Sequence, residues 1–494
     1  MLGESTSLLA NTPPARKARP AAAVLCLALL GLAYSRTAKG SRVRAAGLSS
    51  SPDFPRPPTD DTAAPGDAVA FIDVTMDDFL AFPAVVDWLR RYVDDPVNAS
   101  RSVEARGALL AYLPARLTIE LDAAAVAGSL GRVAASGHVA FSLYLGTVAS
   151  WTIVMSARGA LERIAPGKSA NSAGTSHFCA LKNKDEDTLL LMSVVNNSAS
   201  GYAFEWDWRG TGAYARVGGT RGGVWGTHDI QWAARRDGGA RDAFWVSEAG
   251  HALPDYCAYD QNLTLVRADD GAILRKIALP GSSCGARAPD VNHHQLVADD
   301  AVALVSERNF ASLAKFNLTD ARGRDGAAAQ QRARLAWRVG GPEGTWPIVD
   351  FDGTVHAAGA TVWAQQHNPE FISDDEICMF DCTGLGNESR MLIVHVDEAA
   401  ERATLRWQHR LGVLSQVYGD CDPLPSGNLL ASYWKSEFSD SNSSADDDAV
   451  AGLVEVVRET NAVAWHMRVY GARCPTGDCE NSNTEGWHMY SVER

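Results

Sequence analysis

The sequence predicts an all-β fold from about residue 138 onward, and three observations lead to this prediction. Short segments rich in Val, Ile, Leu and aromatic residues follow one another to the end of the chain. Polar turns recur before apolar strands at intervals of roughly 50 to 75 residues, and three later strands end on tryptophan. Strand groups repeated at this spacing are typical of propeller blades with insertions, whose aromatic residues pack between blades. The turns are Asp185–Asp187, Arg241–Asp242, Asp299–Asp300, Asp374–Asp375 and Ser426–Asn428, and the tryptophans are Trp337, Trp407 and Trp465.

Two alternatives to this assignment stay open. A pair of β-sandwich domains also produces many short strands. The uncharged run His138–Ala157 is long enough to suggest a membrane span, but it is rich in β-branched and aromatic residues and is interrupted by Gly146. We therefore expect two consecutive strands there.

The N-terminal part of the chain divides into three regions. Residues 1–44 contain a basic flank followed by the uncharged run Pro20–Ser35, which predicts a signal peptide or a signal anchor, with Ala33 and Ser35 offering a small-residue cleavage pattern. Residues 45–65, rich in Pro, Ser, Asp and Ala, are expected to form a linker. Residues 66–137 contain helical-looking sequence and no usable motif, so their structure stays uncertain.

Composition and net charge limit the class of protein and the kinds of partner that we expect. The 494 residues are 46% hydrophobic and 21% charged, as in a soluble globular protein. The net charge of −14 disfavours nucleic-acid binding, so small molecules or proteins are the expected partners, with a membrane involved only through an N-terminal anchor.

Sequons and cysteines agree with secretory routing. Eight cysteines follow the signal segment, an even number suited to disulfides, and Cys474 and Cys479 bracket a short turn. A zinc site at Cys378-x3-Cys382 is an alternative, although no second Cys/His pair at finger spacing accompanies it. We predict a secreted or membrane-anchored glycoprotein with disulfide bonds. The six sequons are Asn98, Asn196, Asn262, Asn317, Asn387 and Asn442.

A set of motifs in residues 138–494 resembles the arylsulfotransferase family. The motifs are Thr227-His228-Asp229-Ile230-Gln231, Asp290-x-x-His293, Ser306-x-Arg308-Asn309, Trp337-x-x-Gly340-Gly341, Gln366-His367, Phe380-Asp381, Ser389-Arg390, Leu424-Pro425-x-Gly427-Asn428 and the closing Tyr490–Arg494. The resemblance implies a six-bladed β-propeller. It also implies transfer of a sulfuryl group from an aryl sulfate donor to a phenolic acceptor through a sulfated histidine, with no metal, nucleotide or other cofactor.

The resemblance also implies the site residues. His367 matches the family's nucleophile, and His228, His293 and Arg308 match its companions. The chain departs from the family in having Gln295 and Cys382 at positions where asparagine is usual, which leaves the substrate in doubt. These residue types suit sulfuryl transfer. A neutral imidazole is a nucleophile near pH 7, and a guanidinium donates hydrogen bonds to several oxygens at once.

Several alternatives concern the same residues. Either His228 or His293 can serve as the general acid. Because neighbouring strand residues point to opposite faces, only one of His293 and His294 is expected to face a common centre. Arg308 has a structural alternative, an ion pair with an acidic neighbour. A non-catalytic extracellular propeller that binds a glycan, a small anion or a protein is the main rival function, and a quinoprotein-type dehydrogenase is the third.

Overall fold

A computed structural model describes sixteen stretches of the chain. The predicted signal segment, the linker, His228 and the sequons at Asn98, Asn196, Asn387 and Asn442 lie outside them. The described residues are 70–87, 116–121, 137–145, 149–166, 177–183, 187–194, 201–217, 229–234, 242–248, 261–280, 290–319, 331–382, 388–416, 418–435, 451–470 and 488–493.

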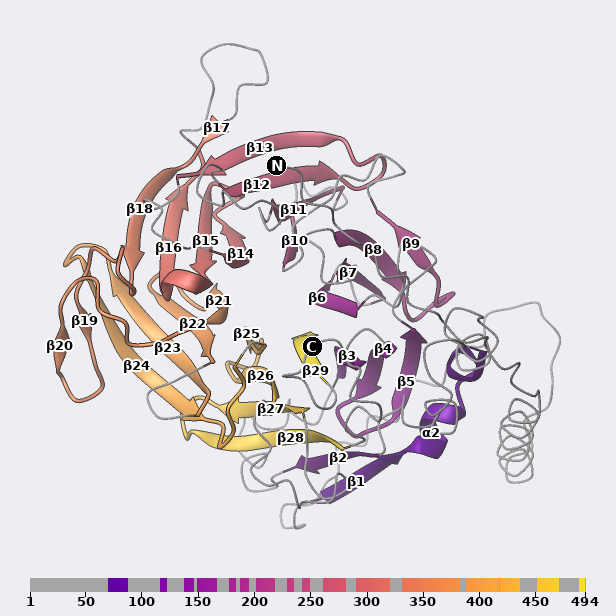
Figure 1. The fold of residues 1–494 in the computed structure, drawn as a ribbon. Helices are drawn as coiled ribbons and strands as arrows, with labels where there is room; N and C mark the ends of the chain where they lie inside the picture. The colour runs from indigo at the N-terminus through magenta and orange to yellow at the C-terminus, as the bar shows by residue number, and fades with distance from the viewer. Residues whose placement is uncertain are drawn as a thin grey trace, which may run out of the picture.

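Six sheets, each with four antiparallel strands at its core, stand around a common axis and form a six-bladed β-propeller (Figure 1). Blade 1 contains β29 (His488–Glu493), β3 (His138–Leu145), β4 (Ala149–Ser156) and β5 (Leu161–Pro166). Blade 2 contains β6 (His177–Asn183), β7 (Thr188–Val194), β8 (Gly201–Asp207) and β9 (Tyr214–Arg216). Blade 3 contains β10 (Ile230–Trp232), β11 (Ala243–Glu248), β12 (Gln261–Arg267) and β13 (Ile273–Leu279).

The remaining blades follow the same order from the centre outward. Blade 4 contains β14 (Val291–Val297), β15 (Val302–Glu307), β16 (Ser312–Asn317) and β18 (Arg334–Val339). Blade 5 contains β21 (His367–Phe371), β22 (Glu376–Asp381), β23 (Arg390–Asp397) and β24 (Arg402–Arg410). Blade 6 contains β25 (Asp420–Pro423), β26 (Leu429–Trp434), β27 (Ala451–Val457) and β28 (Ala462–Tyr470). The inner strands are thus β29, β6, β10, β14, β21 and β25 (Figure 1).

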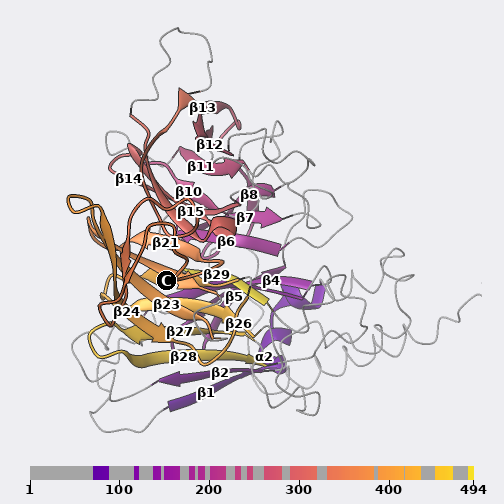
Figure 2. The same ribbon diagram turned by 60° about the vertical axis from the view of Figure 1, so that its left-hand side comes forward.

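Pairings between distant parts of the sequence complete the ring. The C-terminal strand β29 pairs with β3, so the last strand of the chain closes the first blade. The N-terminal strands β1 (Ala70–Thr75) and β2 (Arg116–Leu121) extend blade 6 by pairing with β28 (Figure 2). A short helix, α2 (Met76–Leu80), follows β1. Three further short strands also extend blades 3 and 5, namely β17 (Gln331–Arg332) on β13 and the pair β19 (Ile348–Val349) and β20 (Val355–His356) on β24.

The repeat predicted from the sequence is confirmed. Each predicted turn is followed by the second strand of a blade, and these strands are β7, β11, β15, β22 and β26. Trp337, Trp407 and Trp465 lie on the outer strands of blades 4, 5 and 6. Trp465 packs into a cluster shared with blade 1 and donates its indole N–H to the carbonyl of Ala157 at 2.8 Å. Burial of these rings between blades is a main source of the hydrophobic stabilisation of the ring.

The run His138–Ala157 forms β3 and β4, as expected from its β-branched composition. Among the described residues, no helix is both long and apolar enough to cross a membrane.

Candidate active site and central pocket

His293 and Asp229 form a buried pair between blades 3 and 4. The Nδ1 of His293 lies 3.0 Å from Oδ2 of Asp229, and the two side chains are 4% and 3% exposed. Asp229 also accepts the backbone N–H of His294 at 3.0 Å. Burial by itself raises the pKa of Asp229, but the charges of His293 and His294 outweigh it and lower that pKa. An ionised Asp229 accepts the Nδ1–H of His293 and so fixes the orientation of its ring.

His294 also approaches Asp229, with Nδ1 at 3.5 Å from Oδ2. The expectation that only one of the two histidines faces a common centre is therefore wrong. A register shift between Val291 and His293 interrupts the strand alternation on which that expectation depended. Burial lowers the pKa of His294 to about 4, although Asp229 opposes the shift.

His367 is the first residue of β21 and is 3% exposed. Its Nδ1 lies 2.9 Å from the carbonyl oxygen of Gln365 and 3.2 Å from Sγ of Cys382. A carbonyl oxygen only accepts hydrogen bonds, so Nδ1 carries a proton, and the lone pair of the ring in its neutral form is on Nε2. Gln365 and Asn368 flank this histidine with φ angles of 52° and 45°. Left-handed backbone at two non-glycine residues so close together is the kind of strain that gathers at functional sites.

Arg308 follows β15 in a short 3-10 turn, Arg308–Phe310. Its Nη1 lies 3.3 Å from Oδ2 of Asp290, so the structural alternative, an ion pair with an acidic neighbour, is present. The Nε–H of Arg308 is buried and makes no hydrogen bond. Burial raises the pKa of the Cys382 thiol well above its usual value, and the positive charge of Arg308 opposes that shift. Cys382 is thus next to His367 and within the electrostatic influence of Arg308.

The Gly340-Gly341 motif brings the segment before β21 against the turn that carries Arg308. Both glycines have left-handed φ angles, 79° and 65°. A Cβ on Gly341 would lie 1.6 Å from the carbonyl oxygen of Phe310, and one on Gly340 would lie 2.5 Å from the ring of Trp363. Only glycine permits this approach.

Two buried ion pairs support the same region. Arg338 binds both carboxylate oxygens of Glu307, at 2.6 and 2.7 Å, next to Arg308 in the sequence. In blade 5, the Nε of Arg390 donates to Asp381 at 2.9 Å. Asp381 in turn accepts the backbone N–H of Ala364 at 3.1 Å, in the segment that leads to His367. The Phe380-Asp381 and Ser389-Arg390 motifs therefore fix the backbone of the segment that leads to His367, and we assign them no catalytic role.

Side chains of the inner strands also join blade 3 to 4, 4 to 5, 5 to 6 and 6 to 1. Gln295, one of the two departures from the family pattern, belongs to this set, because its Oε1 accepts the backbone N–H of Phe371 at 2.7 Å. The position serves to join blades 4 and 5. The other links are Gln231 Oε1 to Leu296 N, Asn292 Nδ2 to Gln366 O, Asn368 Nδ2 to Asp422 Oδ1, and Asp420 Oδ2 to Val492 N.

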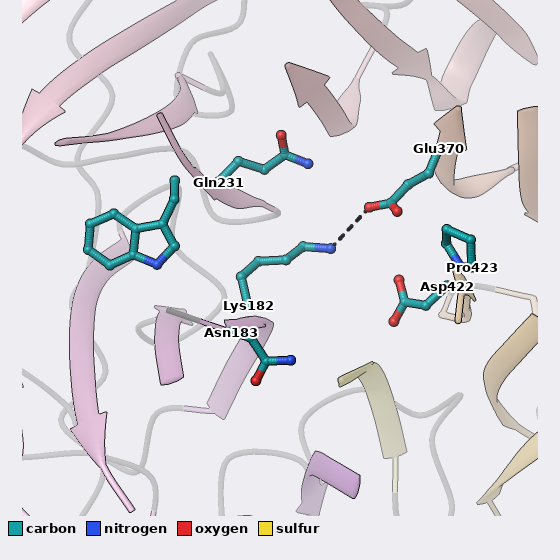
Figure 3. A pocket seen from close by; sticks show the side chains of 7 residues that line it. Lys182, Asn183, Gln231, Glu370, Asp422 and Pro423 are labelled. Carbon is teal, nitrogen blue, oxygen red and sulfur yellow. Dashed lines mark hydrogen bonds and ion pairs between the residues drawn. The ribbon is translucent and has the colours of Figure 1, made fainter. Parts of the chain in front are cut away.

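A polar pocket of about 220 Å³ opens at the C-terminal ends of four inner strands (Figure 3). Inside it, the Nζ of Lys182 lies 3.2 Å from Oε1 of Glu370, and both side chains are partly buried. The Nε2 of His293 is 3.9 Å from the same Glu370 oxygen. The lining residues are the last two of β6, β10 and β25 and the next-to-last of β21, that is Lys182, Asn183, Gln231, Trp232, Asp422, Pro423 and Glu370.

The structure divides the residues predicted for catalysis. His367 starts the inner strand β21, Arg308 follows the end of β15 next to the start of β14, and the two share Cys382 as a neighbour. His293 lies in the middle of β14 and contacts Asp229 and Glu370 instead. His228 lies outside the described residues. Of the other three residues, all described by the structure, none lines the pocket.

Three charged residues of the pocket, Lys182, Glu370 and Asp422, were not predicted from the sequence. Each is a charged residue at the end of a short strand, a position that the sequence alone does not distinguish from an ordinary solvated turn. The one usable signal was that a lysine and two carboxylates end strands that otherwise bury apolar residues.

The expected disulfides are wrong for three of the eight cysteines. Cys378, Cys382 and Cys421 are free and buried in the cluster between blades 5 and 6, where thiols pack as small apolar groups. The Sγ of Cys378 donates to the carbonyl of Cys421 at 3.1 Å. In the part of the chain that the structure describes, no group of three His, Cys, Asp or Glu side chains is placed to hold a metal ion.

Comparisons with known proteins give remote similarities of fold. No protein-family model matches the sequence, and no curated protein matches it. Among solved structures, a protein of unknown function from Bacteroides caccae is 12% identical with a TM-score of 0.40, over 67% of this chain and 93% of that one. The periplasmic gluconolactonase of Pseudomonas aeruginosa is 10% identical with a TM-score of 0.33, over 76% and 86% of the two chains. Hydrazine synthase from Kuenenia stuttgartiensis is 13% identical with a TM-score of 0.33, over 62% and 67%. Similarities this remote say nothing about the chemistry of this chain.

Proposed function

We propose that this protein transfers a sulfuryl group from an aryl sulfate ester to a phenolic acceptor through a sulfohistidine at His367. The observation that supports the proposal best is the tautomer of the His367 ring, that is, which of its nitrogens carries the proton. Its Nδ1–H is donated to Gln365, which leaves the lone pair on Nε2, the atom that a covalent mechanism needs as nucleophile.

The first half of the reaction forms one bond and breaks one. The Nε2 of His367 attacks the sulfur, the bond between sulfur and the aryl oxygen breaks, and the phenolate leaves with a proton from a general acid. In the second half the acceptor hydroxyl loses its proton to the same group, and its oxygen attacks the sulfur and releases His367. The sulfuryl group and one proton are thus exchanged, and no oxidant or water is consumed.

Arg308 and His293 supply the supporting roles. The buried Nε–H of Arg308 makes no hydrogen bond, so it is available for a sulfuryl oxygen. The Asp229 carboxylate holds His293 at 3.0 Å and stabilises the imidazolium that forms when this ring takes a proton. His293 therefore has the features of the general acid and base.

Steady-state kinetics test the proposal. With a chromogenic aryl sulfate and a phenol, a covalent intermediate gives parallel double-reciprocal lines, and without phenol it gives a burst of released chromophore. His367→Asn should abolish both, whereas the control His395→Asn, on a partly exposed histidine of the same blade paired with Asp375, should not. A protein inert toward every aryl sulfate tested would favour the non-catalytic binding propeller instead.

We also propose that the propeller resides in the secretory pathway, on the basis of the N-terminal apolar run and the six sequons. Glycosidase treatment of protein from its native source should lower its mass. No mass change would contradict this location.

A further inference from the structure

The peptide group that joins Gln366 to His367 is held by blade 4, the neighbouring blade. The Nδ2 of Asn292 donates to the carbonyl oxygen of Gln366 at 2.8 Å, and the Oγ of Ser306 donates to the same oxygen at 3.3 Å. The register of β14 against β15 shifts at Asn292, and a bulge of this kind re-aims a side chain. Asn292 is therefore directed at blade 5 instead of filling the ladder of its own blade.

The side chain of Gln366 is held by the same blade. Its Nε2 donates to the carbonyl oxygen of Ser312 at 2.9 Å and to the Oγ of Ser306 at 3.2 Å. The Oγ of Ser312 in turn donates to Glu307 at 2.7 Å, the carboxylate that Arg338 binds. Gln366 is thus connected, through its backbone and its side chain, to the part of blade 4 that contains the buried ion pair.

Two buried amides are a costly way to join two blades. Asn292 and Gln366 are 2% and 0% exposed, and the amide oxygen of each has no hydrogen-bond partner among the residues that the structure describes. A buried acceptor without a donor costs free energy, so stability alone would favour apolar side chains here. A role in orienting a neighbouring group explains why amides occupy these positions.

The group that they orient is His367. Its Nδ1 lies 2.9 Å from the carbonyl oxygen of Gln365, so this hydrogen bond spans three residues with Gln366 in the middle. The φ angles of Gln365 and Asn368, 52° and 45°, are left-handed, and strained backbone persists only where its surroundings hold it. Holding Gln366 therefore holds the imidazole of His367 against Gln365.

We propose that Asn292 and Gln366 are positioning residues, which fix the orientation and the Nδ1–H tautomer of the His367 ring from the neighbouring blade. Both act through His367, and neither makes or breaks a bond. The catalytic value of this orientation rests on the proposed function, in which Nε2 must face the sulfur of the donor. The orientation itself is measurable without any substrate.

¹⁵N NMR of the full chain with labelled histidine rings reports the tautomer, at a pH where the ring is neutral. His367→Asn identifies the signals of this ring by their loss, and in wild type they should show a proton on Nδ1 alone. Asn292→Leu keeps the approximate volume and removes the donor, so it should give a mixture of both tautomers. Gln295→Leu is the matched control, because Gln295 joins β14 to β21 at Phe371, the other end of β21, and should leave the tautomer unchanged.

Ser306→Ala provides the same test if Asn292→Leu does not fold. It removes one donor to the carbonyl of Gln366 and one acceptor of its side chain, so it should also mix the tautomers, to a smaller extent. A wild-type ring with its proton on Nε2, or a single Nδ1–H tautomer in every folded variant, overturns the proposal. A mixture in Gln295→Leu as well would also overturn it, because any loosening of the two blades would then have the same effect.

Burst kinetics measure the catalytic consequence. Asn292→Leu should slow the burst of chromophore by about tenfold to a hundredfold, because it misplaces the nucleophile. The donor concentration that gives half the maximal burst rate should stay the same, since no contact with the donor is removed. An unchanged burst rate in folded Asn292→Leu contradicts the positioning role. A wild-type protein without any burst refutes the proposed function alone, because the NMR result does not depend on substrate.

Discussion

The two ends of the inner strands present different chemistry on the same scaffold. At the strand starts, left-handed residues flank His367, and ion pairs buried in blades 4 and 5 support the segments that carry His367 and Arg308. At the strand ends, Lys182 and Glu370 form an ion pair that lines a polar pocket. A propeller fixes where the strand ends lie, and the residues placed there decide the chemistry of each end. The two ends should therefore respond differently to the same kind of substitution.

The largest expected effect is on stability, through the buried ion pair near the strand starts of blade 4. Arg338→Met leaves Glu307 buried and without its partner, which should lower the free energy of unfolding by about 3–5 kcal/mol. Urea denaturation measures it. The control Arg458→Met breaks the more exposed pair with Glu376 and should cost about 1 kcal/mol or less. Similar losses in the two variants would contradict the special role of the buried pair.

Arg308→Lys should have the next largest effect, on transfer rate and not on folding. Lysine keeps the positive charge but has no N–H group where arginine has its Nε–H. We therefore expect turnover to fall roughly a hundred- to a thousandfold. The rate is measured with a chromogenic aryl sulfate, and urea denaturation checks the fold. A folded variant with unchanged turnover would leave Arg308 with only its structural pair to Asp290.

Acid should lower the free energy of unfolding by a similar amount, because of the buried His294 in β14. The pKa of His294 is about 4 in the folded chain, against about 6.5 when unfolded, so the unfolded chain binds this proton first. Stability should fall as the pH drops from about 6.5 to about 4, by up to about 3 kcal/mol for this group. His466, whose pKa burial lowers to about 3, acts in the same direction.

Urea midpoints measured between pH 7 and pH 4.5 check this expectation. His294→Asn should flatten the pH dependence, and His395→Asn, on a partly exposed ring, should leave it unchanged. An unaltered slope in folded His294→Asn would show that another group causes the acid sensitivity.

The smallest expected effect concerns Cys382. Gln365 alone fixes the proton on Nδ1 of His367, so Cys382→Asn, which restores the residue usual in the resembling family, should change turnover by less than about tenfold. Steady-state rates decide it. A loss as large as that of Arg308→Lys would mean that the thiol itself positions the ring.

Local sequence predicted the blades well because each blade repeats a turn followed by an apolar strand, as before β11 and β15. It could not predict that β29 closes blade 1 or that β1 and β2 extend blade 6, because these pairings join residues hundreds of positions apart. At the site, motifs singled out His367 and Arg308, yet the role of Gln295 emerged only from its contact with the neighbouring blade. The pocket was missed because four strand ends meet there only in three dimensions.

The central claim is the covalent role of His367, and mass spectrometry of donor-treated protein tests it most directly. Wild-type protein incubated with an aryl sulfate without acceptor, and digested under alkaline conditions that preserve an N-sulfated imidazole, should carry one sulfuryl group on the peptide that contains Gln366 and His367. His367→Asn should carry none, and added phenol should remove the group from wild type. An enzyme that turns over aryl sulfate but carries no adduct on this peptide, or carries it on His293, would contradict the account.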